Sequence, residues 1–391
     1  MGEPVKTASR MAHIQPFHVM ELLARARALE ARGHDIVHME IGEPDFATPA
    51  SIVAAGHDAL EAGHTHYTPA VGLPALREAI SDYYRERFGV SVLPERIVVT
   101  PGASTALQLI MALLVGPGDQ VLLTDPGYPC NRNFVHLVNG ESVSVRVTAE
   151  NGFRATPENL MDAWTKRTRA LMVATPANPT GTCLAPDELK ELEKLVAGRD
   201  AVLIVDEIYQ GLTYDGPDTT ALALGSDHVM VVNSFSKYFG MTGWRIGWLV
   251  APEPLVPELD KLAQNLYLSA PTISQHAAIV ALSPGVRPEL DRRRDEFRRR
   301  RDFLYPRLAS LGFSPGPLPG GAFYLYADSS AVAESSFELC ERLLVEAGVA
   351  ITPGIDFGAY RAESHVRFAY TTSLDRLELG VRRLEEYLSG R

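Results

Sequence analysis

Cysteine is scarce in this chain of 391 residues. The three cysteines, Cys130, Cys183 and Cys340, lie far apart and form no CxxC pair. A sparse, odd set of this kind argues against a disulfide framework and against a thiolate metal site, and it fits a reducing compartment. We therefore expect a cytoplasmic protein that holds no metal.

Long hydrophobic runs and an excess of positive charge are also lacking. The longest uncharged stretch, from Ile97 to Gly118, contains Pro101, Gly102 and Pro117 and is typical of a strand, a turn and a buried helix. The N-terminal stretch has no hydrophobic signal core. With 37 basic and 48 acidic residues, the formal charge of -11 argues against broad capture of nucleic acid or of an anionic membrane.

Basic residues cluster only at Arg292–Arg294 and Arg298–Arg301. Such a cluster could form a stripe that binds nucleic acid, but acidic residues interleave with it. We therefore interpret the segment as a solvated or interface face of a helix. The interleaved acidic residues are Asp291, Asp295, Glu296 and Asp302.

The middle of the chain alternates short apolar runs with helical patterns and shows no internal repeat. Runs such as AVLIV are apolar on both faces, which suits a buried, mostly parallel sheet covered by helices. Helices are predicted over Ala103–Val115 and Asp187–Ala197. The predicted strands are Ile97–Thr100, Val121–Thr124, Ala170–Thr175, Ala201–Val205, Val229–Asn233 and Ile246–Val250.

The pattern changes after Leu282. A long charged helix over Glu289–Leu311 precedes an alternating strand at 322–327, a helix, a strand at 364–370 and an amphipathic helix over Leu374–Leu388. This order predicts a smaller α+β domain that the N-terminal forty-odd residues join in space. The predicted division is an N-terminal arm and part of the small domain at 1–45, a large domain at 46–285 and a small C-terminal domain at 286–391.

Polar groups stand at the carboxyl ends of predicted strands, where ligands gather in parallel sheets. Asp206 follows the run AVLIV directly. A carboxylate at the mouth of a buried strand is costly unless it meets a cation or hydrogen-bond donors. Taken alone, Asp206 is a candidate catalytic group, a structural cap or a metal ligand.

Lys237 follows the next predicted strand and is one of six lysines in the chain. No other charged residue lies between Met230 and Trp244, which predicts a partly apolar surrounding. Burial lowers the pKa of a lysine amine from its usual value of about 10.4 and so favours a nucleophile that forms a Schiff base. Taken alone, a lysine that reaches the surface is the simpler interpretation.

Nearby residues favour the Schiff-base interpretation of Lys237 over a surface lysine. Arg245 comes soon after the hydroxyls of Ser234 and Ser236, and a guanidinium with hydroxyls describes a phosphate cup. The turn 100–104, opened by Gly102, leads into a helix whose first amides can bind the same dianion. With the amine and the carboxylate, these parts specify a ligand that has an aldehyde, a phosphate and a protonatable ring nitrogen.

The segment SFSKYFGMTGWRIG at 234–247 resembles the pyridoxal-phosphate attachment motif of the class I and II aminotransferases. Four more motifs follow that family's order: GEPDF at 42–46, NPTG at 178–181, DEIY at 206–209 and VRFAY at 366–370. The resemblance covers the chain from about His13 onward. It implies an α/β protein of the fold type I pyridoxal-phosphate-dependent transferases. Such proteins have a mostly parallel central sheet in a large cofactor domain and a smaller α+β domain, and they form homodimers with shared active sites.

The resemblance also implies roles around the cofactor, pyridoxal 5'-phosphate. Lys237 would form the Schiff base and move a proton between the substrate α carbon and the cofactor's C4′ carbon. Asp206 would keep the pyridine nitrogen protonated, so that the ring accepts electrons. Asn178 and Tyr209 would hydrogen-bond the phenolic oxygen, and Tyr128 would stack on the ring.

Further implied roles concern the phosphate and the substrate. Arg367 would clamp the α-carboxylate bidentately, with help from Asn178 and the backbone of Gly42. Tyr67 would reach the phosphate from the neighbouring subunit. The remaining residues expected at the phosphate are Gly102, Ala103, Ser104, Ser234, Ser236 and Arg245.

The implied reaction is a ping-pong transfer of an amino group between an L-amino acid and a 2-oxo acid. Relatives selective for dicarboxylates place a second cation in the side-chain pocket, and the position where some carry a lysine aligns with Ala112. The segments 14–17 and 265–268 are uncharged and add apolar surface, the second from the partner subunit. We therefore expect neutral or hydrophobic amino donors, with glutamate and 2-oxoglutarate as a second pair.

Three alternatives stay open. The chain could be an aminotransferase of the aspartate/glutamate type or a carbon–sulfur β-lyase on the same fold. It could also be a cofactor-sensing regulator, but such proteins carry an added DNA-binding domain and only about a dozen residues precede the matched region. Zinc and serine hydrolases are disfavoured because the sequence has no HExxH and no GxSxG.

Overall fold

The computed structural model describes residues 5–390, and a seven-stranded mixed sheet forms its centre. The strand order is β2-β8-β7-β6-β5-β3-β4. The strands from β7 to β4 are parallel, whereas β8 runs antiparallel to both of its neighbours. The expected mostly parallel sheet is therefore confirmed. Its strands are β2 (Ile97–Thr100), β3 (Gln120–Asp125), β4 (Glu141–Arg146), β5 (Thr168–Ala174), β6 (Val202–Asp206), β7 (Val229–Ser234) and β8 (Gly247–Val250).

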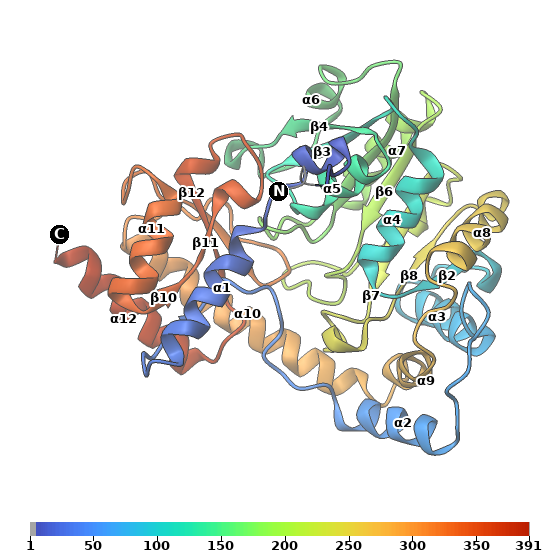
Figure 1. Cartoon of the computed structure of the whole chain (residues 1–391), viewed down its shortest axis with the longest axis horizontal. Coiled ribbons are helices and arrows are strands. Elements are labelled where there is room, and N and C mark those ends of the chain that lie inside the picture. The colour runs from blue at the N-terminus through green and yellow to red at the C-terminus, as the bar shows by residue number, and fades with distance from the viewer. Residues whose placement is uncertain (1–4, 391) are drawn as a thin grey trace.

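Helices cover both faces of this sheet (Figure 1). One face packs on α4, α5 and α8, with Leu107 and Leu259 in the core between them. The opposite face packs on α3 and α7, and this second core continues through Phe297 of α10 into the C-terminal part. The helices of this region are α2 (Ala50–Glu61), α3 (Pro74–Phe88), α4 (Ala103–Leu114), α5 (Cys130–Leu137), α6 (Pro157–Met161), α7 (Pro186–Ala197), α8 (Val256–Leu266), α9 (Thr272–Ala281) and α10 (Arg287–Ser310).

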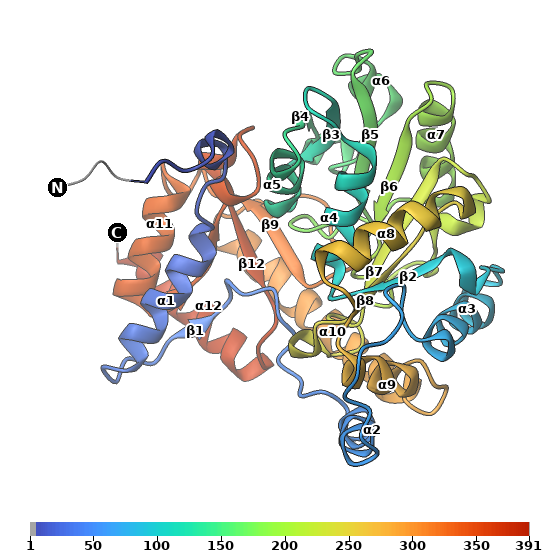
Figure 2. The same cartoon turned by 45° about the vertical axis from the view of Figure 1, so that its right-hand side comes forward.

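A second, smaller layer combines the two ends of the chain, as Figure 2 shows by colour. Its antiparallel sheet has the order β11-β12-β9, and a short parallel pair joins β1 of the N-terminal segment to β10. This arrangement matches the predicted α+β part, whereas the boundaries at 45/46 and 285/286 stay predictions. The elements are α1 (His18–Glu30), β1 (Val37–His38), β9 (Tyr324–Asp328), α11 (Ser336–Arg342), β10 (Val349–Ala350), β11 (Thr352–Pro353), β12 (His365–Ala369) and α12 (Leu374–Ser389).

Two arginines of the arginine-rich helix α10 direct their charge into the molecule, whereas Arg292, Arg298 and Arg299 are exposed. The guanidinium of Arg300 is buried and donates to both carboxylate oxygens of Asp45, at 2.8 and 3.0 Å. Arg301 is also buried and pairs with Asp215. These ion pairs join α10 to segments of the large layer, which agrees with the interface interpretation. Within residues 5–390, no helix combines the length and the apolar character that a bilayer crossing needs.

Candidate active site

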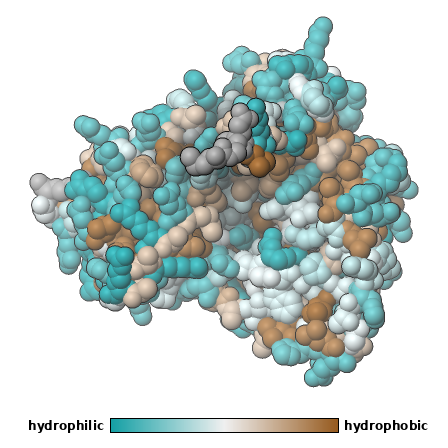
Figure 3. All heavy atoms as spheres, viewed as in Figure 1, coloured by the Kyte–Doolittle hydropathy of each residue, from teal (hydrophilic) through white to brown (hydrophobic). Residues whose placement is uncertain are grey.

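A cavity of about 480 Å³ lies at the carboxyl ends of the central strands, where the two layers meet. Figure 3 shows the molecule hollowed between these layers. The cavity collects side chains from β6, the segment after β7, the start of α4, and β12. Most of the predicted site residues line it: Gly42, Ala103, Ser104, Tyr128, Asn178, Asp206, Tyr209, Ser236, Lys237, Arg245 and Arg367.

Lys237 follows β7 and reaches into this cavity, where its amine donates a hydrogen bond to the Gly42 carbonyl at 2.6 Å. Burial lowers the pKa of the Lys237 amine to about 8, and the positive charges of Arg367 and Arg245 act in the same direction. About a tenth of the amine is therefore neutral at pH 7, far more than for a lysine with the usual pKa of about 10.4. An amine in that state can act as a nucleophile or as a base.

Asp206 is the last residue of β6, and its side chain is 5% exposed. One carboxylate oxygen accepts a hydrogen bond from the Ile208 amide at 3.0 Å. Burial raises the pKa of this carboxyl to about 6, against the opposing effects of that hydrogen bond and of Lys237. A buried carboxylate with a single hydrogen bond favours a cationic group beside it. A protonated ring nitrogen satisfies this demand.

The start of α4 and Arg245 form an anion cup. Gly102 precedes α4 with φ +83°, and a Cβ atom there would lie 2.5 Å from a guanidinium nitrogen of Arg245. Glycine is therefore needed both for the backbone conformation and for the approach of the arginine. The hydroxyls of Ser234 and Ser236 lie 3.0 Å apart beside this turn, and the amides of α4 point their partial positive charge the same way.

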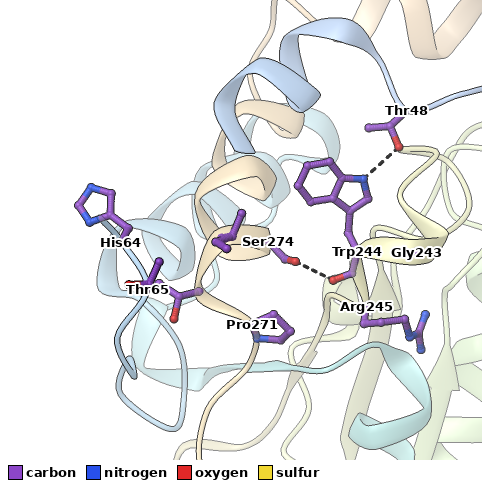
Figure 4. A pocket seen from close by; sticks show the side chains of 10 residues that line it. Thr48, His64, Thr65, Gly243, Trp244, Arg245, Pro271 and Ser274 are labelled. Carbon is purple, nitrogen blue, oxygen red and sulfur yellow. Dashed lines mark hydrogen bonds between the residues drawn. The ribbon is translucent and has the colours of Figure 1, made fainter. Parts of the chain in front are cut away.

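The support of Arg245 comes from its outer side (Figure 4). The Trp244 indole donates to the Thr48 hydroxyl at 3.1 Å, and the Ser274 hydroxyl donates to the Trp244 carbonyl at 2.7 Å. Arg245 itself has φ +52°, in the left-handed region. Arg245 also lines a separate cavity of about 690 Å³ together with Thr48, His64 and Trp244. Arg245 therefore borders both cavities.

Arg367 of β12 is 3% exposed and held in one orientation. Its two terminal nitrogens donate to the Asn178 side-chain oxygen at 2.9 Å and to the Glu40 carbonyl at 2.6 Å. The guanidinium lies 4.3 Å from the centre of the Tyr324 ring and 4.7 Å from that of Phe357. A planar, fixed guanidinium of this kind suits bidentate capture of a carboxylate.

Sequence reasoning missed Tyr324. Its hydroxyl lies 2.8 Å from that of Tyr209, and burial raises the pKa of both phenols. Tyr324 also packs so closely on Gly42 that a Cβ atom at Gly42 would lie 1.9 Å from the phenol oxygen. The alternating strand at 322–327 was predicted, but alternation alone does not tell which side chain faces a site.

Sequence reasoning also missed most of the α1 wall, which we define as Phe17, Val19, Met20, Leu23 and Arg27. These residues line the cavity from one side of α1 and the turn before it. Their spacing of three, four and seven residues is the available signal, because such positions share a helix face. The other missed lining residues are Ile41, Glu43, Leu107, Ala174, Ile208 and Thr242.

Five predicted placements fall outside the cavity lining. Ala112 is exposed on α4, and the expectation that it stands at the side-chain pocket is wrong. Eight helical residues carry it about 12 Å along the axis from Ser104, away from the site. Tyr67, which is 81% exposed, and the segment 265–268 lie at the surface of this chain. Ser234 and Gly102 stand directly behind the lining residues Ser236 and Arg245.

Metal ligands do not gather at this site. Across residues 5–390, no group of three or more His, Cys, Asp or Glu side chains is arranged to hold a metal ion. The lining residues include a lysine, the buried carboxylate of Asp206 and three arginines, and this excess of cations suits an organic anion.

Comparisons with known proteins agree with this chemistry. A family model described as aminotransferase class I and II matches residues 34–384. The valine–pyruvate aminotransferase of Mycobacterium tuberculosis is 36% identical over 378 residues, which cover 96% of this chain and 97% of that protein. The aspartate/prephenate aminotransferase of Thermus thermophilus is 36% identical over 381 residues, which cover 97% and 98%.

A solved structure also supports the match to aminotransferases. An aminotransferase from Mycobacterium tuberculosis superposes with a TM-score of 0.95 at 36% identity, and the match covers 99% of this chain and 100% of that one. The sequence match, the fold and the residues gathered in the cavity therefore agree. The chain belongs to the class I and II aminotransferases, a family of pyridoxal-phosphate-dependent enzymes.

Proposed function

We propose that this enzyme binds pyridoxal 5'-phosphate and moves an amino group between a neutral or hydrophobic L-amino acid and a 2-oxo acid. One observation carries the proposal: the Lys237 amine, the Asp206 carboxyl, the anion cup and Arg367 all border one cavity. Each supplies a contact that one part of the cofactor or of an amino acid needs.

The residues present fit the cofactor. The cup around Gly102 and Arg245 would hold the phosphate, and a side chain at Gly102 would fill that cup. Asp206 would hold the ring nitrogen in its protonated form, and Tyr128 would cover the ring. Asn178 and Tyr209 would bind the phenolic oxygen. When bound, pyridoxal phosphate supplies an aldehyde that captures the amino group and a ring that accepts electrons.

Three side chains of the protein have separate roles in the proposed reaction. Arg367 binds the substrate α-carboxylate and so fixes the α carbon near Lys237. The pKa of the Lys237 amine is lowered to about 8, so the amine can take the proton from the substrate α carbon. The protonated amine can later give a proton back, which completes the exchange. Asp206 would supply the negative charge that keeps the ring nitrogen of the cofactor protonated.

The α1 wall supports neutral or hydrophobic donors. Phe17, Met20 and Leu23 present apolar side chains to the cavity, and Leu107 and Ile208 add more from the large layer. An unpaired distal carboxylate against this surface would lose a few kcal/mol through desolvation. A panel of amino donors, assayed with pyruvate and 2-oxoglutarate as acceptors, tests the proposal. Equal rates for leucine and aspartate would contradict it.

Arg27 favours a second candidate, an enzyme that also takes acidic substrates. It lies on the same wall, and its side chain makes no hydrogen bond or ion pair with the residues that the structure describes. A free cation beside an apolar wall lets one cavity receive an apolar donor and then the distal carboxylate of 2-oxoglutarate. Arg25, in contrast, pairs with Glu341 at 2.5 Å and does not line the cavity.

These two arginines make a matched test. We expect Arg27→Met to raise KM for 2-oxoglutarate by about tenfold, as loss of an ion pair to substrate does, and to leave KM for pyruvate unchanged. The control Arg25→Met is expected to change neither value. If Arg27→Met acts equally on both acceptors, Arg27 does not recognise acidic substrates.

The carbon–sulfur lyase alternative is separated by the products. A transaminase given one amino acid and no acceptor forms at most one equivalent of 2-oxo acid and releases no ammonia. A lyase continuously releases ammonia together with a thiol from cystathionine or hydrogen sulfide from cysteine. Continuous ammonia release without an acceptor would favour the lyase and would contradict the proposal.

A further inference from the structure

Helix α1 depends on a distant residue for its N-terminal cap. Phe17 stands at the cap position and offers no side-chain hydrogen bond to the helix. The first two amides, of His18 and Val19, instead donate to the two carboxylate oxygens of Asp356 at 3.0 and 2.9 Å. A carboxylate in this place satisfies two free helix amides and complements the helix dipole.

Asp356 stands in a turn that is hydrogen-bonded to the segment 125–132, which borders the proposed cofactor site. It is 2% exposed and ends the turn Gly354–Asp356. A guanidinium nitrogen of Arg132 donates to the Asp356 carbonyl at 2.9 Å, and the Gly127 amide donates to the Phe357 carbonyl at 2.8 Å. Both donors belong to the segment 125–132, which also carries Tyr128 into the cavity.

The segment 125–132 also contacts the loop after Asp356 through Asp125. A carboxylate oxygen of Asp125 accepts from the amides of Ala359 and Tyr360 at 3.0 and 3.2 Å. Its other oxygen lies so near Gly358 that a Cβ atom there would approach it to 1.8 Å. Loop 356–360 is therefore pressed against the cofactor side and cannot shift without breaking these contacts.

Loop 356–360 also touches the residue expected to hold the substrate. The ring of Phe357 lies 4.7 Å from the Arg367 guanidinium. One short loop thus contacts α1, the segment of Tyr128 and Arg367. It fixes the place of the α1 wall relative to the groups that hold the cofactor and the α-carboxylate.

We propose that Asp356 is a positioning residue that sets substrate choice by holding α1 against the cavity. The proposal rests on the proposed aminotransferase function. Asp356 does not line the cavity, whereas Phe17, Met20 and Leu23 on the helix it caps do. Substrates whose side chains reach this wall depend on Asp356, and alanine, whose side chain is a methyl group, does not.

The test compares a large apolar donor with a small one. We expect Asp356→Asn to lower kcat/KM for leucine by about tenfold and kcat/KM for alanine by less than about twofold, since a misplaced apolar wall penalises only the methylenes that contact it. The control is Asp375→Asn, an exposed acid in the first turn of α12. It should leave the ratio of the two constants unchanged.

Two further readouts separate positioning from general loss of structure. Amide hydrogen exchange in the peptide 17–23 should rise in Asp356→Asn and not in the control. The affinity for pyridoxal phosphate, followed by absorbance, should stay unchanged. Equal losses for leucine and alanine, or unaltered exchange in α1, would overturn the proposal.

A second variant keeps the proposal testable if Asp356→Asn does not fold. His18 is the first residue of α1, where proline is tolerated, and the preceding residue Phe17 already has an extended backbone. His18→Pro removes one of the two hydrogen bonds to Asp356 and leaves the carboxylate in place. It should shift the leucine-to-alanine ratio in the same direction by a smaller amount. If no amino acid is transaminated by the native enzyme, the proposed function fails, whereas the exchange result still tests the cap.

Discussion

The cofactor side and the substrate side of the cavity are built in different ways. On the cofactor side, Lys237 and Arg245 come from one segment of fourteen residues, and Asp206 ends a neighbouring strand. On the substrate side, the α1 wall comes from the N-terminal part and is capped by Asp356, which lies 338 residues from His18. Chemistry is therefore encoded locally here, and the substrate-facing wall is placed by tertiary contacts.

This comparison predicts its largest effect at Lys237. Lys237→Ala should lower kcat by more than about 1,000-fold for every donor, because the proton transfer at the α carbon loses its base. Steady-state assays with alanine and leucine measure the loss. The control Lys261→Ala removes an exposed lysine that pairs with Glu258, far from the cavity lining, and should leave kcat unchanged. Turnover that survives in Lys237→Ala would contradict the mechanism.

Arg367 stands between the two sides and should affect all substrates alike. Arg367→Lys should raise KM for donor and acceptor together by about 10- to 100-fold, since lysine cannot reproduce the bidentate geometry. KM is measured for leucine, alanine, pyruvate and 2-oxoglutarate. If KM rises only for the amino donors or only for the 2-oxo acids, the assignment of the α-carboxylate to Arg367 is wrong.

Gly102 offers a sharper test of the anion cup. Gly102→Ala should weaken pyridoxal phosphate binding by about tenfold, because the added Cβ displaces the Arg245 guanidinium. Gly118 has the same φ of +83° but nothing within 4 Å of its Cβ position, so Gly118→Ala also places an alanine at a positive φ and does not touch the cup. Both variants should lose about 1 kcal/mol of stability, and only the first should lose cofactor affinity. Equal cofactor affinities would argue against the cup.

Tyr67 tests whether a second copy of the chain completes the cofactor side. The side chain is 81% exposed and absent from its own chain's cavity, which supports a role in a homodimer. Tyr67→Phe should weaken cofactor binding by a few fold, as loss of one hydrogen bond to a charged group does. Hybrids of Tyr67→Phe with Lys237→Ala should then contain a complete site and bind the cofactor with native affinity. If the hybrids bind no better than Tyr67→Phe alone, Tyr67 does not act across subunits.

The sequence predicts the buried central strands better than the exposed edge of the sheet. The predicted strands ending at Thr100 and near Asp206 and Ser234 agree with the structure to within about one residue, because their apolar runs are buried on both faces. Strand β4 was missed because it lies at the sheet edge, where the sequence ESVSVR is largely exposed. The central strands are predicted from continuous apolar runs, which report burial on both faces, and the alternating sequence of β4 has no such run.

The candidate site divides in the same way. Residues in contiguous motifs were brought together in one cavity, whereas Tyr324, Arg27 and Asp356 were not anticipated. Their positions depend on how α1, β9 and the loop after β11 pack against the large layer. Ala112 illustrates the opposite error, since it lies on a correctly predicted helix but about 12 Å along the axis from Ser104.

The most direct test of the central assignment is to trap the bond between the enzyme and pyridoxal phosphate. After borohydride reduction of the loaded protein, peptide mapping should find the label on Lys237, and the rate of loading should rise with pH to half its maximum near pH 8, where the amine loses its proton. A label on another lysine, or a protein that takes up no pyridoxal phosphate, would contradict the account.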